Sequence, residues 1–311
     1  MATIDGTNGD DVLYALASED VVNGLDGDDK LYTVFDANTL SGGEGNDALR
    51  ATASFSILDG GAGDDTIAVN LGHDNVVTGG AGDDAIRLGP GDLNYVSGGD
   101  GNDRLEGDRV SESGFHAGSG HDAVWIDQGI LVLVDGGDGD DVLSATGSQV
   151  DLLGGEGNDV LDATYAAQSA FGNYLDGGSG DDVLVARGQA TLTGGEGRDT
   201  FVVIGTDPNT YINDFSNAAQ NGSQALRAED VLDLRETLQS LSVLDKPLGA
   251  LVGQGYLVVN SEQNVGGGET NDTVVQIDPD GRAGDLPPVT TVTLLDTSLA
   301  TQAQDMNNWM V

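Results

Sequence analysis

Single apolar residues alternate with glycine-rich acidic phrases over the first two hundred residues of the chain. The phrase Gly-Gly-x-Gly-x-Asp-x-apolar-x occurs eleven times, and its third glycine recurs at steps of 18, 18, 18, 19, 19, 19, 19, 18, 23 and 17 residues. Position eight is apolar in every copy, and a second apolar column lies two residues before each later copy, from Val22 to Leu192. Each repeat therefore predicts two short strands that each direct one apolar side chain inward.

A unit of about 18 residues with so few apolar side chains cannot bury its inner face alone. Such units stack on their neighbours as the coils of a solenoid, with strands that run parallel along the stack. Because paired strands lie ~4.8 Å apart, the eleven coils predict a rod on the order of 50 Å long.

Position six of the phrase is an aspartate in every copy: Asp11, Asp29, Asp47, Asp65, Asp84, Asp103, Asp122, Asp141, Asp159, Asp182 and Asp199. Stacked carboxylates repel one another unless a cation lies between them. The glycines permit tight turns and let backbone carbonyls approach an object closely. Carboxylate and carbonyl oxygens in a flexible loop, in a chain without cysteine, indicate calcium rather than zinc or copper. A merely solvated acidic face is the alternative, and the regular spacing argues against it.

These residues resemble the RTX, or hemolysin-type, calcium-binding nonapeptide repeat. The resemblance covers residues 6–202 and implies an all-β fold, a right-handed parallel β-roll with about 18 residues per coil. It also implies that calcium lies between consecutive loops, bound by the position-six aspartates and by carbonyls of the glycine loops. The glycines implied as ligands are Gly42, Gly45, Gly60, Gly63, Gly79, Gly82, Gly98, Gly101, Gly136, Gly139, Gly154, Gly157, Gly177, Gly180, Gly194 and Gly197.

Several copies depart from the phrase. Thr7 and Leu25 stand where a second glycine is expected, Ala117 replaces a first glycine, and His121 and Arg198 occupy position five, where we expect weaker sites. Alternate nonapeptides are degenerate, so we expect one dominant calcium column with at most ten ions. Ten ions would bring the formal charge from -42 to -22. The opposite turns often carry Asp, Asn or Ser and are predicted to be capped by side chains without metal. The 23-residue step predicts a bulge.

Residues 203–311 differ in composition and are predicted to form a smaller, mainly β C-terminal cap after the β-roll of residues 1–202. Leu234 and Leu238 predict a short helix. The segments "GYLVVN", "DTVVQID" and "VTTVTLLD" predict strands, and "DPDG" at 278–281 predicts a turn. The order of these segments resembles the C-terminal target domain of type I secretion substrates in Gram-negative bacteria. That resemblance implies export through an ABC transporter with an uncleaved C-terminal signal.

Composition narrows the classes of partner. The chain has 53 Asp and Glu against 11 Lys and Arg, so nucleic acid and anionic membranes are poor partners and metal cations are good ones. No segment reaches the ~20 apolar residues of a membrane helix, and the first residues lack a signal-peptide pattern, so we expect no membrane insertion and no N-terminal export signal. His73, His116 and His121 do not form a spaced metal set. Neither a nucleophile elbow nor a zinc-protease helix motif occurs, and we expect no catalytic site.

The sequence favours a secreted, extracellular or cell-surface, non-catalytic module that binds calcium, folds on doing so after type I secretion, and serves a structural or adhesin-type role. The expected partners are calcium ions, the ABC transporter during export, and the cell surface or other copies of the chain. Two alternatives stay open: the C-terminal fragment of a larger RTX adhesin, and the repeat module of an RTX exoenzyme whose catalytic domain is absent here. An ice-binding surface would need a regular threonine ladder on a flat face, which the outward positions do not supply.

Overall fold

The computed structural model describes residues 1–165, 172–205, 209–215, 230–240, 257–262, 272–277, 289–294 and 309–310. The chain divides into two compact units, Met1–Gly157 and Asn158–Val311. Both units are built from strands, and the one helix in the described ranges, α1 (Arg235–Ser240), belongs to the second unit. The fold is a parallel β-solenoid, as the sequence predicts.

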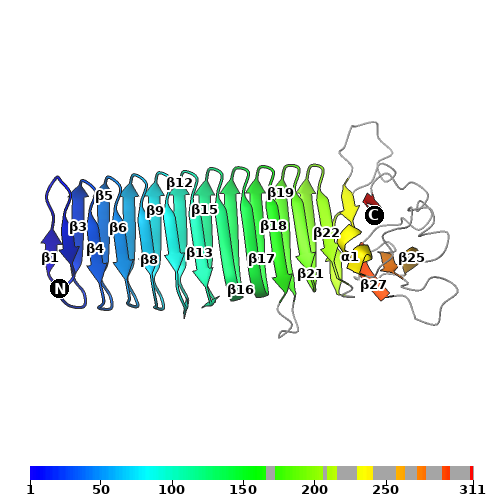
Figure 1. The fold of residues 1–311 in the computed structure, drawn as a ribbon, viewed down its shortest axis with the longest axis horizontal. Helices are drawn as coiled ribbons and strands as arrows, with labels where there is room; N and C mark the ends of the chain where they lie inside the picture. The colour runs from blue at the N-terminus through cyan, green and yellow to red at the C-terminus, as the bar shows by residue number, and fades with distance from the viewer. Residues whose placement is uncertain are drawn as a thin grey trace. The chain divides into compact units, whose positions relative to one another are not determined.

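Each coil of the first unit has one strand before its glycine loop and one strand after it (Figure 1). The strands before the loops form a parallel sheet, the entry sheet: β1 (Thr3–Asp5), β3 (Val21–Asp26), β5 (Thr39–Glu44), β7 (Ile57–Ala62), β9 (Val76–Ala81), β12 (Tyr95–Asp100) and β15 (Gly114–Ser119). The strands after the loops form a second parallel sheet, the exit sheet: β2 (Val12–Tyr14), β4 (Lys30–Thr33), β6 (Ala48–Ala51), β8 (Thr66–Val69), β10 (Ala85–Leu88) and β13 (Arg104–Asp108).

At the opposite turn, which joins one exit strand to the next entry strand, short strands add to the first unit. These are β11 (Gly91–Asp92) and β14 (Val110–Ser111), which pair in parallel. The long strands β16 (Ala123–Asp138) and β17 (Val142–Glu156) run without interruption from the exit sheet through this turn into the entry sheet.

Neighbouring coils are in register residue for residue. In the entry sheet Thr39 pairs with Val21 on one side and with Ile57 on the other, and in the exit sheet Leu49 pairs with Ile67. Because the steps of 18 and 19 residues preserve this register, each position of the phrase forms a straight column along the unit. A side-chain type that recurs in the sequence is therefore stacked in space.

The core consists of three apolar columns, one more than the sequence predicts. The position-eight residues from Leu31 onward are at most 2% exposed, and the entry-strand column from Val22 onward is fully buried. Position ten is also buried, as at Ala51, Val69 and Leu88. The prediction of two inward residues per coil is wrong because the exit strand extends two residues further and its alternation turns a third side chain inward.

The second unit continues with the same two kinds of parallel strand. After the loops come β18 (Val160–Tyr165), β20 (Val183–Arg187), β22 (Thr200–Ile204), β24 (Val231–Asp233) and β28 (Trp309–Met310). Before the loops, or in line with those strands, come β19 (Asn173–Ser179), β21 (Ala190–Glu196), β23 (Thr210–Ile212) and β27 (Val289–Leu294). The strands β25 (Leu257–Glu262), β26 (Asp272–Ile277) and β27 pair antiparallel. The predicted helix and the three predicted C-terminal strands are confirmed.

The C-terminal segment adds strands to existing sheets. Phe201 pairs with Leu232 and Ile212 pairs with Leu294, both in parallel. The boundary predicted after residue 202 stays a prediction. The turn at 278–281 lies outside the described residues, as does part of the 23-residue step. In the described part of the chain, no helix has the length and apolar character needed to cross a membrane.

Candidate metal site: a column of buried aspartates

The position-six aspartates form a continuous column within each unit. From Asp29 to Asp141 each is at most 2% exposed although it lies in a loop, and Asp11 is half-buried. In the first unit the backbone N–H of each aspartate donates to Oδ1 of the aspartate in the next coil at 2.7 or 2.8 Å. From Asp159 to Asp199 the same bonds measure 2.8 and 3.1 Å. These bonds hold one inward carboxylate per coil at a fixed spacing.

The other carboxylate oxygen, Oδ2, is buried and has no hydrogen-bond donor along most of this column. The residues concerned are Asp29, Asp47, Asp65, Asp84, Asp103, Asp122 and Asp182. Burying a carboxylate oxygen without a partner is costly, because the group loses its hydration and gains nothing in exchange. The same unmet demand in successive coils indicates that a cation or a proton belongs beside each Oδ2.

In most loops the position-one glycine lies against this oxygen. A Cβ added to Gly42 would lie 2.1 Å from Oδ2 of Asp47 and 2.4 Å from the carbonyl oxygen of Gly60 in the next coil. The same arrangement recurs at Gly60, where the corresponding distances are 2.2 Å to Asp65 and 2.6 Å to Gly79. A carboxylate oxygen and a carbonyl oxygen thus converge on a point that only glycine leaves open.

Other predicted glycines set the close stacking of the loops. Gly45, at position four, has φ of +121°, and a Cβ on it would lie 2.4 Å from the carbonyl oxygen of Gly27 in the preceding coil. Six other predicted position-four glycines repeat this stacking: Gly63, Gly82, Gly101, Gly139, Gly157 and Gly197. The position-one glycines beside an Oδ2 are Gly42, Gly60, Gly79, Gly98, Gly136, Gly177 and Gly194. Within each unit the structure therefore brings these predicted aspartates and glycines together in a column of loops.

Burial raises the pKa of the column carboxyl groups from Asp29 to Asp122, and the negative charge of nearby aspartates raises it further. The pKa rises to about 6 at Asp47, Asp65 and Asp84 and to about 7 at Asp103. The backbone N–H bond to each carboxylate lowers the pKa, but by less than burial raises it. Without a cation, these groups therefore bind protons more tightly than in the unfolded chain.

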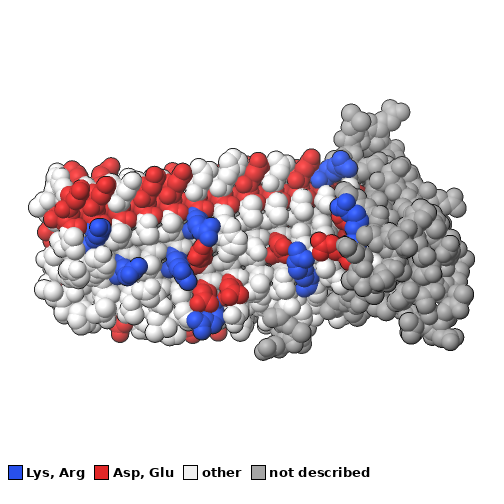
Figure 2. All heavy atoms as spheres, in the orientation of Figure 1, with Lys and Arg blue, Asp and Glu red and all other residues white. Residues whose placement is uncertain are grey.

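The donor set fits calcium. In the described ranges, no three acidic, histidine or cysteine side chains gather around one point. The available donors are instead one carboxylate per coil and the backbone carbonyls of stacked loops. Calcium accepts a mixture of carboxylate and carbonyl oxygens in flexible geometry, whereas zinc and copper prefer nitrogen and sulfur ligands. Figure 2 shows the acidic side chains gathered along one edge of the strands.

Two further ladders of hydrogen bonds flank the strands, one exposed and one built mainly of neutral side chains. At position five the N–H of Asn46 donates to Oδ1 of Asp28 at 2.9 Å, on the exposed side of the loops. At the opposite turn the N–H of Asp20 donates to Oδ1 of Asn38 at 2.8 Å, and the ladder continues through amide and hydroxyl groups. The predicted side-chain capping of the opposite turns is confirmed.

Six segments of the chain match the family model of the RTX calcium-binding nonapeptide repeat. They are residues 5–40, 41–76, 72–92, 94–109, 135–164 and 169–201, together more than half of the chain. The chain belongs to the RTX calcium-binding nonapeptide repeat family. Its solenoid is therefore a calcium-binding β-roll.

The RTX solenoid is similar to a solved structure described as a hyperactive, Ca²⁺-dependent, β-helical antifreeze protein from an Antarctic bacterium. The TM-score is 0.52 and the sequence identity 23%, over 75% of this chain and 77% of that chain. At this identity the likeness extends to the fold alone. No curated protein matches the sequence.

The RTX aspartate column extends beyond the glycine phrases. The N–H of Asp199 donates to Oδ1 of Asp230 at 3.0 Å, and Asp230 is 3% exposed. The segment Asp230-Val231-Leu232 repeats positions six to eight of the phrase without its glycines, and its strand pairs with β22. The glycine pattern therefore missed this residue, although an aspartate two places before a buried leucine was a signal that could have found it.

A second carboxylate outside the phrases lies against the last RTX loop. Asp214 accepts hydrogen bonds from the N–H groups of Gly194 at 2.9 Å and Gly195 at 2.8 Å. These two backbone N–H groups are therefore hydrogen-bonded by a side chain and not by a further glycine loop. No sequence pattern predicts this contact, because the 20-residue distance between Asp214 and Gly194 follows no repeat.

Departures from the RTX phrase are accommodated within the stack. Leu25 adopts φ of +89° at position two, where Gly43 has +120°. Ala117 is buried and brings a methyl group to position one, which elsewhere is left open for the oxygens. His121 keeps the position-five ladder, because its Nδ1 accepts the N–H of Asp140 at 2.9 Å. The N–H of Arg198 also joins that ladder. The weaker sites predicted in these loops remain predictions.

Proposed function

We propose that the chain is a secreted structural or adhesin-type module that folds when calcium fills its aspartate column after export. The observation that carries the proposal is the series of buried Oδ2 atoms without donors, most of which lie near a carbonyl oxygen of the next loop. The position-six aspartates, from Asp11 to Asp199, and the position-one carbonyls would hold the ions. Asp230 would extend the column by one position beyond the ten that eleven loops enclose.

Calcium offsets the main electrostatic obstacle to folding. The chain carries a formal charge of -42, and the fold stacks buried carboxylates in successive coils. Self-repulsion of this kind opposes the compact state. Calcium bound only by the folded chain converts its binding free energy into folding free energy. Because each aspartate is also hydrogen-bonded to the next coil, ordering one loop favours ordering its neighbour, and the transition should be cooperative.

Export follows from the same chemistry. Extracellular calcium modules have dissociation constants of ~10⁻⁴ to 10⁻³ M, so their sites stay empty at low intracellular calcium. The chain would then remain unfolded and able to pass through a type I secretion channel, and would fold outside. Support for this route is the family membership and the resemblance of the segments around β24, α1, β26 and β27 to type I secretion target domains.

Antifreeze activity is not proposed for this chain. The outward column of the entry sheet reads Thr39, Ile57, Val76 and Tyr95 in successive coils. Side chains of such different size and polarity do not make the regular threonine ladder that an ice-binding face would need. The likeness to the antifreeze protein therefore serves here only as support for the solenoid.

A calcium titration followed by far-UV circular dichroism and small-angle scattering tests the proposal. Starting from chelator, the full chain should change cooperatively from an expanded coil to a compact β-rich form at about 10⁻⁴ to 10⁻³ M calcium. Magnesium at the same concentrations should not produce the change, because it demands a stricter octahedral geometry. A chain that is already folded in chelator, with no response to calcium, would refute calcium-triggered folding.

A further inference from the structure

The outer face of the exit sheet in the first unit differs in charge from the rest of that unit. Its outward positions are positions seven and nine of each phrase. They carry four of the five basic residues of the first unit, Lys30, Arg50, Arg87 and Arg104, and one acid, Glu106; Asp108 and Asp127 lie on the same face two residues further along β13 and β16. Figure 2 shows basic side chains on this largely uncharged face, away from the acidic edge formed by the loops.

The position-nine residues form a straight line across the exit sheet, called here the outer track. Strand pairing places these residues in register from coil to coil. Along the unit they are Tyr14, Tyr32, Arg50, Ala68, Arg87, Glu106, Trp125 and Ser144. The spacing between neighbours is ~4.8 Å, the distance between paired strands. Aromatic rings thus lie toward both ends of the outer track and guanidinium groups lie between them.

The two guanidinium groups within the outer track have no partner among the described residues. Arg104 pairs with Glu106 and Arg109 pairs with Asp108, whereas neither Arg50 nor Arg87 forms an ion pair or hydrogen bond there. Ala68 separates Arg50 from Arg87, so their backbones are about 10 Å apart, two strand spacings. In a chain with 53 acidic residues, two exposed arginines that form no ion pair with a described residue are available for an external anion.

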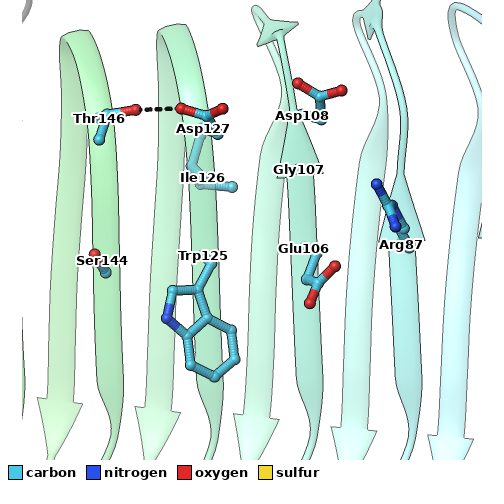
Figure 3. A pocket seen from close by; sticks show the side chains of 9 residues that line it. All are labelled: Arg87, Glu106, Gly107, Asp108, Trp125, Ile126, Asp127, Ser144 and Thr146. Carbon is cyan, nitrogen blue, oxygen red and sulfur yellow. Dashed lines mark hydrogen bonds between the residues drawn. The ribbon is translucent and has the colours of Figure 1, made fainter.

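A shallow depression of about 470 Å³ adjoins Arg87 (Figure 3). Trp125 forms part of its wall, and the guanidinium of Arg104 lies 4.2 Å from the centre of the indole ring, which fixes the ring on the sheet. Polar side chains line the rest of the depression. Asp127 accepts a hydrogen bond from the hydroxyl of Thr146 at 2.8 Å, and Glu106, Asp108 and Ser144 complete the polar lining.

We propose that the outer track binds a linear acidic polysaccharide. Carboxylate or sulfate groups of such a chain would be bound by Arg50 and Arg87, whose planar guanidinium groups suit bidentate contact with these anions. Sugar rings would pack on Tyr32 and Trp125, since aromatic side chains combine apolar contact area with a polar edge. Sugar hydroxyls would donate to Asp127 and the other oxygens of the depression.

The same residues argue against other anionic partners. A second copy of this chain would bring its own acidic loop edge to the outer track. That edge would meet the carboxylates of Glu106, Asp108 and Asp127 as well as the arginines. Hydroxyl groups of a saccharide, in contrast, donate hydrogen bonds to carboxylates. The mixture of free guanidinium, carboxylate and aromatic groups therefore favours a ligand that has both anionic and hydroxyl groups. This inference does not depend on how calcium triggers folding.

Isothermal titration calorimetry with the full chain in about 2 mM calcium tests the inference. The probes are hyaluronan hexasaccharide, sulfated dextran oligosaccharide and, as a neutral control, maltohexaose. At least one acidic probe should bind, and maltohexaose should not. Binding of the neutral sugar with equal affinity would overturn the role of the arginines. The site itself would be overturned if neither acidic probe gave a heat of binding up to about 10 mM, a concentration that exceeds the dissociation constant of even a weak complex.

Variants locate the binding on the outer track. The double variant Arg50→Ala and Arg87→Ala should weaken binding of the acidic probe at least about tenfold, and Trp125→Ala should weaken it by a similar factor. Arg187→Ala removes a cation in the second unit and should leave the affinity unchanged. Circular dichroism of each variant in calcium checks that the fold is kept. Equal losses in the Arg187 variant, or heat that comes only from concentration-dependent self-association in light scattering, would overturn the proposal.

Discussion

Replacement of a column aspartate by asparagine should stabilise the protein in chelator and should lose most of that effect in calcium. Asp84 is suited to the test because it is 2% exposed and its Oδ1 accepts the N–H of Asp65 at 2.7 Å. Asparagine keeps that acceptor and replaces Oδ2 by an amide NH₂, which can donate to the carbonyl oxygen of Gly98 nearby. The substitution therefore removes the buried charge and one oxygen ligand while preserving shape.

The magnitude in chelator follows from the pKa of Asp84. Burial raises it from 3.8 to about 6, so at pH 8 the ionised carboxylate destabilises the metal-free fold by roughly 3 kcal/mol, at 1.36 kcal/mol for each pKa unit. Asp84→Asn removes that penalty and should raise the free energy of unfolding by up to this amount. In about 10 mM calcium most of this gain should be lost, because the variant also loses one ion, which contributes about 1.4 to 2.7 kcal/mol at a dissociation constant of 10⁻⁴ to 10⁻³ M.

Urea unfolding followed by far-UV circular dichroism at pH 8, in chelator and in calcium, measures both values. Asp83→Asn is the matched control, since Asp83 lies next in sequence but its carboxylate faces solvent in the position-five ladder. The control should change stability by less than about 0.5 kcal/mol in either condition. The reasoning is refuted if Asp84→Asn has the same effect on stability in chelator and in calcium, or if Asp83→Asn depends on calcium in the same way.

The remaining predictions concern protons, loop conformation and the end of the column. In calcium-depleted buffer the fold should be most stable near pH 4 and should lose at least about 3 kcal/mol as the pH rises through 7, because the folded-state pKa values of the column exceed the unfolded value of 3.8. Urea unfolding in which stability increases over this pH range would contradict the prediction. Leu25→Gly should stabilise the protein by about 1 kcal/mol, because it relieves a φ of +89°. Gly43→Ala should destabilise the protein by several times that amount, since its Cβ would lie 1.9 Å from a carbonyl oxygen. Thermal melts in which Gly43→Ala is the more stable variant would count against the close stacking of the loops. Asp230→Ala should cost about 1 to 3 kcal/mol by removing the acceptor of the Asp199 N–H, and unchanged protection of that amide in hydrogen exchange would exclude the extended column.

The repeat made most of the fold predictable. A glycine loop, an aspartate and an apolar residue that recur at nearly constant steps allow only one way to bury the apolar side chains, which is to stack coils in register. For the same reason the column of Asp47 and its equivalents could be placed without a structure. What the repeat could not supply was the depth of the core, because position ten varies from alanine to leucine and shows no fixed chemistry.

The repeat pattern could not predict how individual side chains pack between coils. Gly107 occupies position ten, where neighbouring coils have larger residues, and the ring of Phe115 reaches into that space, 2.8 Å from where a Cβ would lie. The two residues compensate each other in volume although neither fits its own column. Likewise, Asp214 and Asp230 lie at sequence distances from their loops that no period predicts, since the chain between the last coils varies in length. Such contacts depend on side-chain packing between coils and not on spacing along the sequence.

Anomalous diffraction from crystals of the full chain grown in calcium tests the central claim most directly. The account predicts a row of calcium peaks, one between each pair of loops, with Oδ2 of Asp47, Asp65 and Asp84 about 2.3 to 2.6 Å from an ion. Carbonyl oxygens of the position-one glycines would complete part of each coordination shell. A folded solenoid whose aspartate column holds no anomalous peaks at saturating calcium would contradict the account.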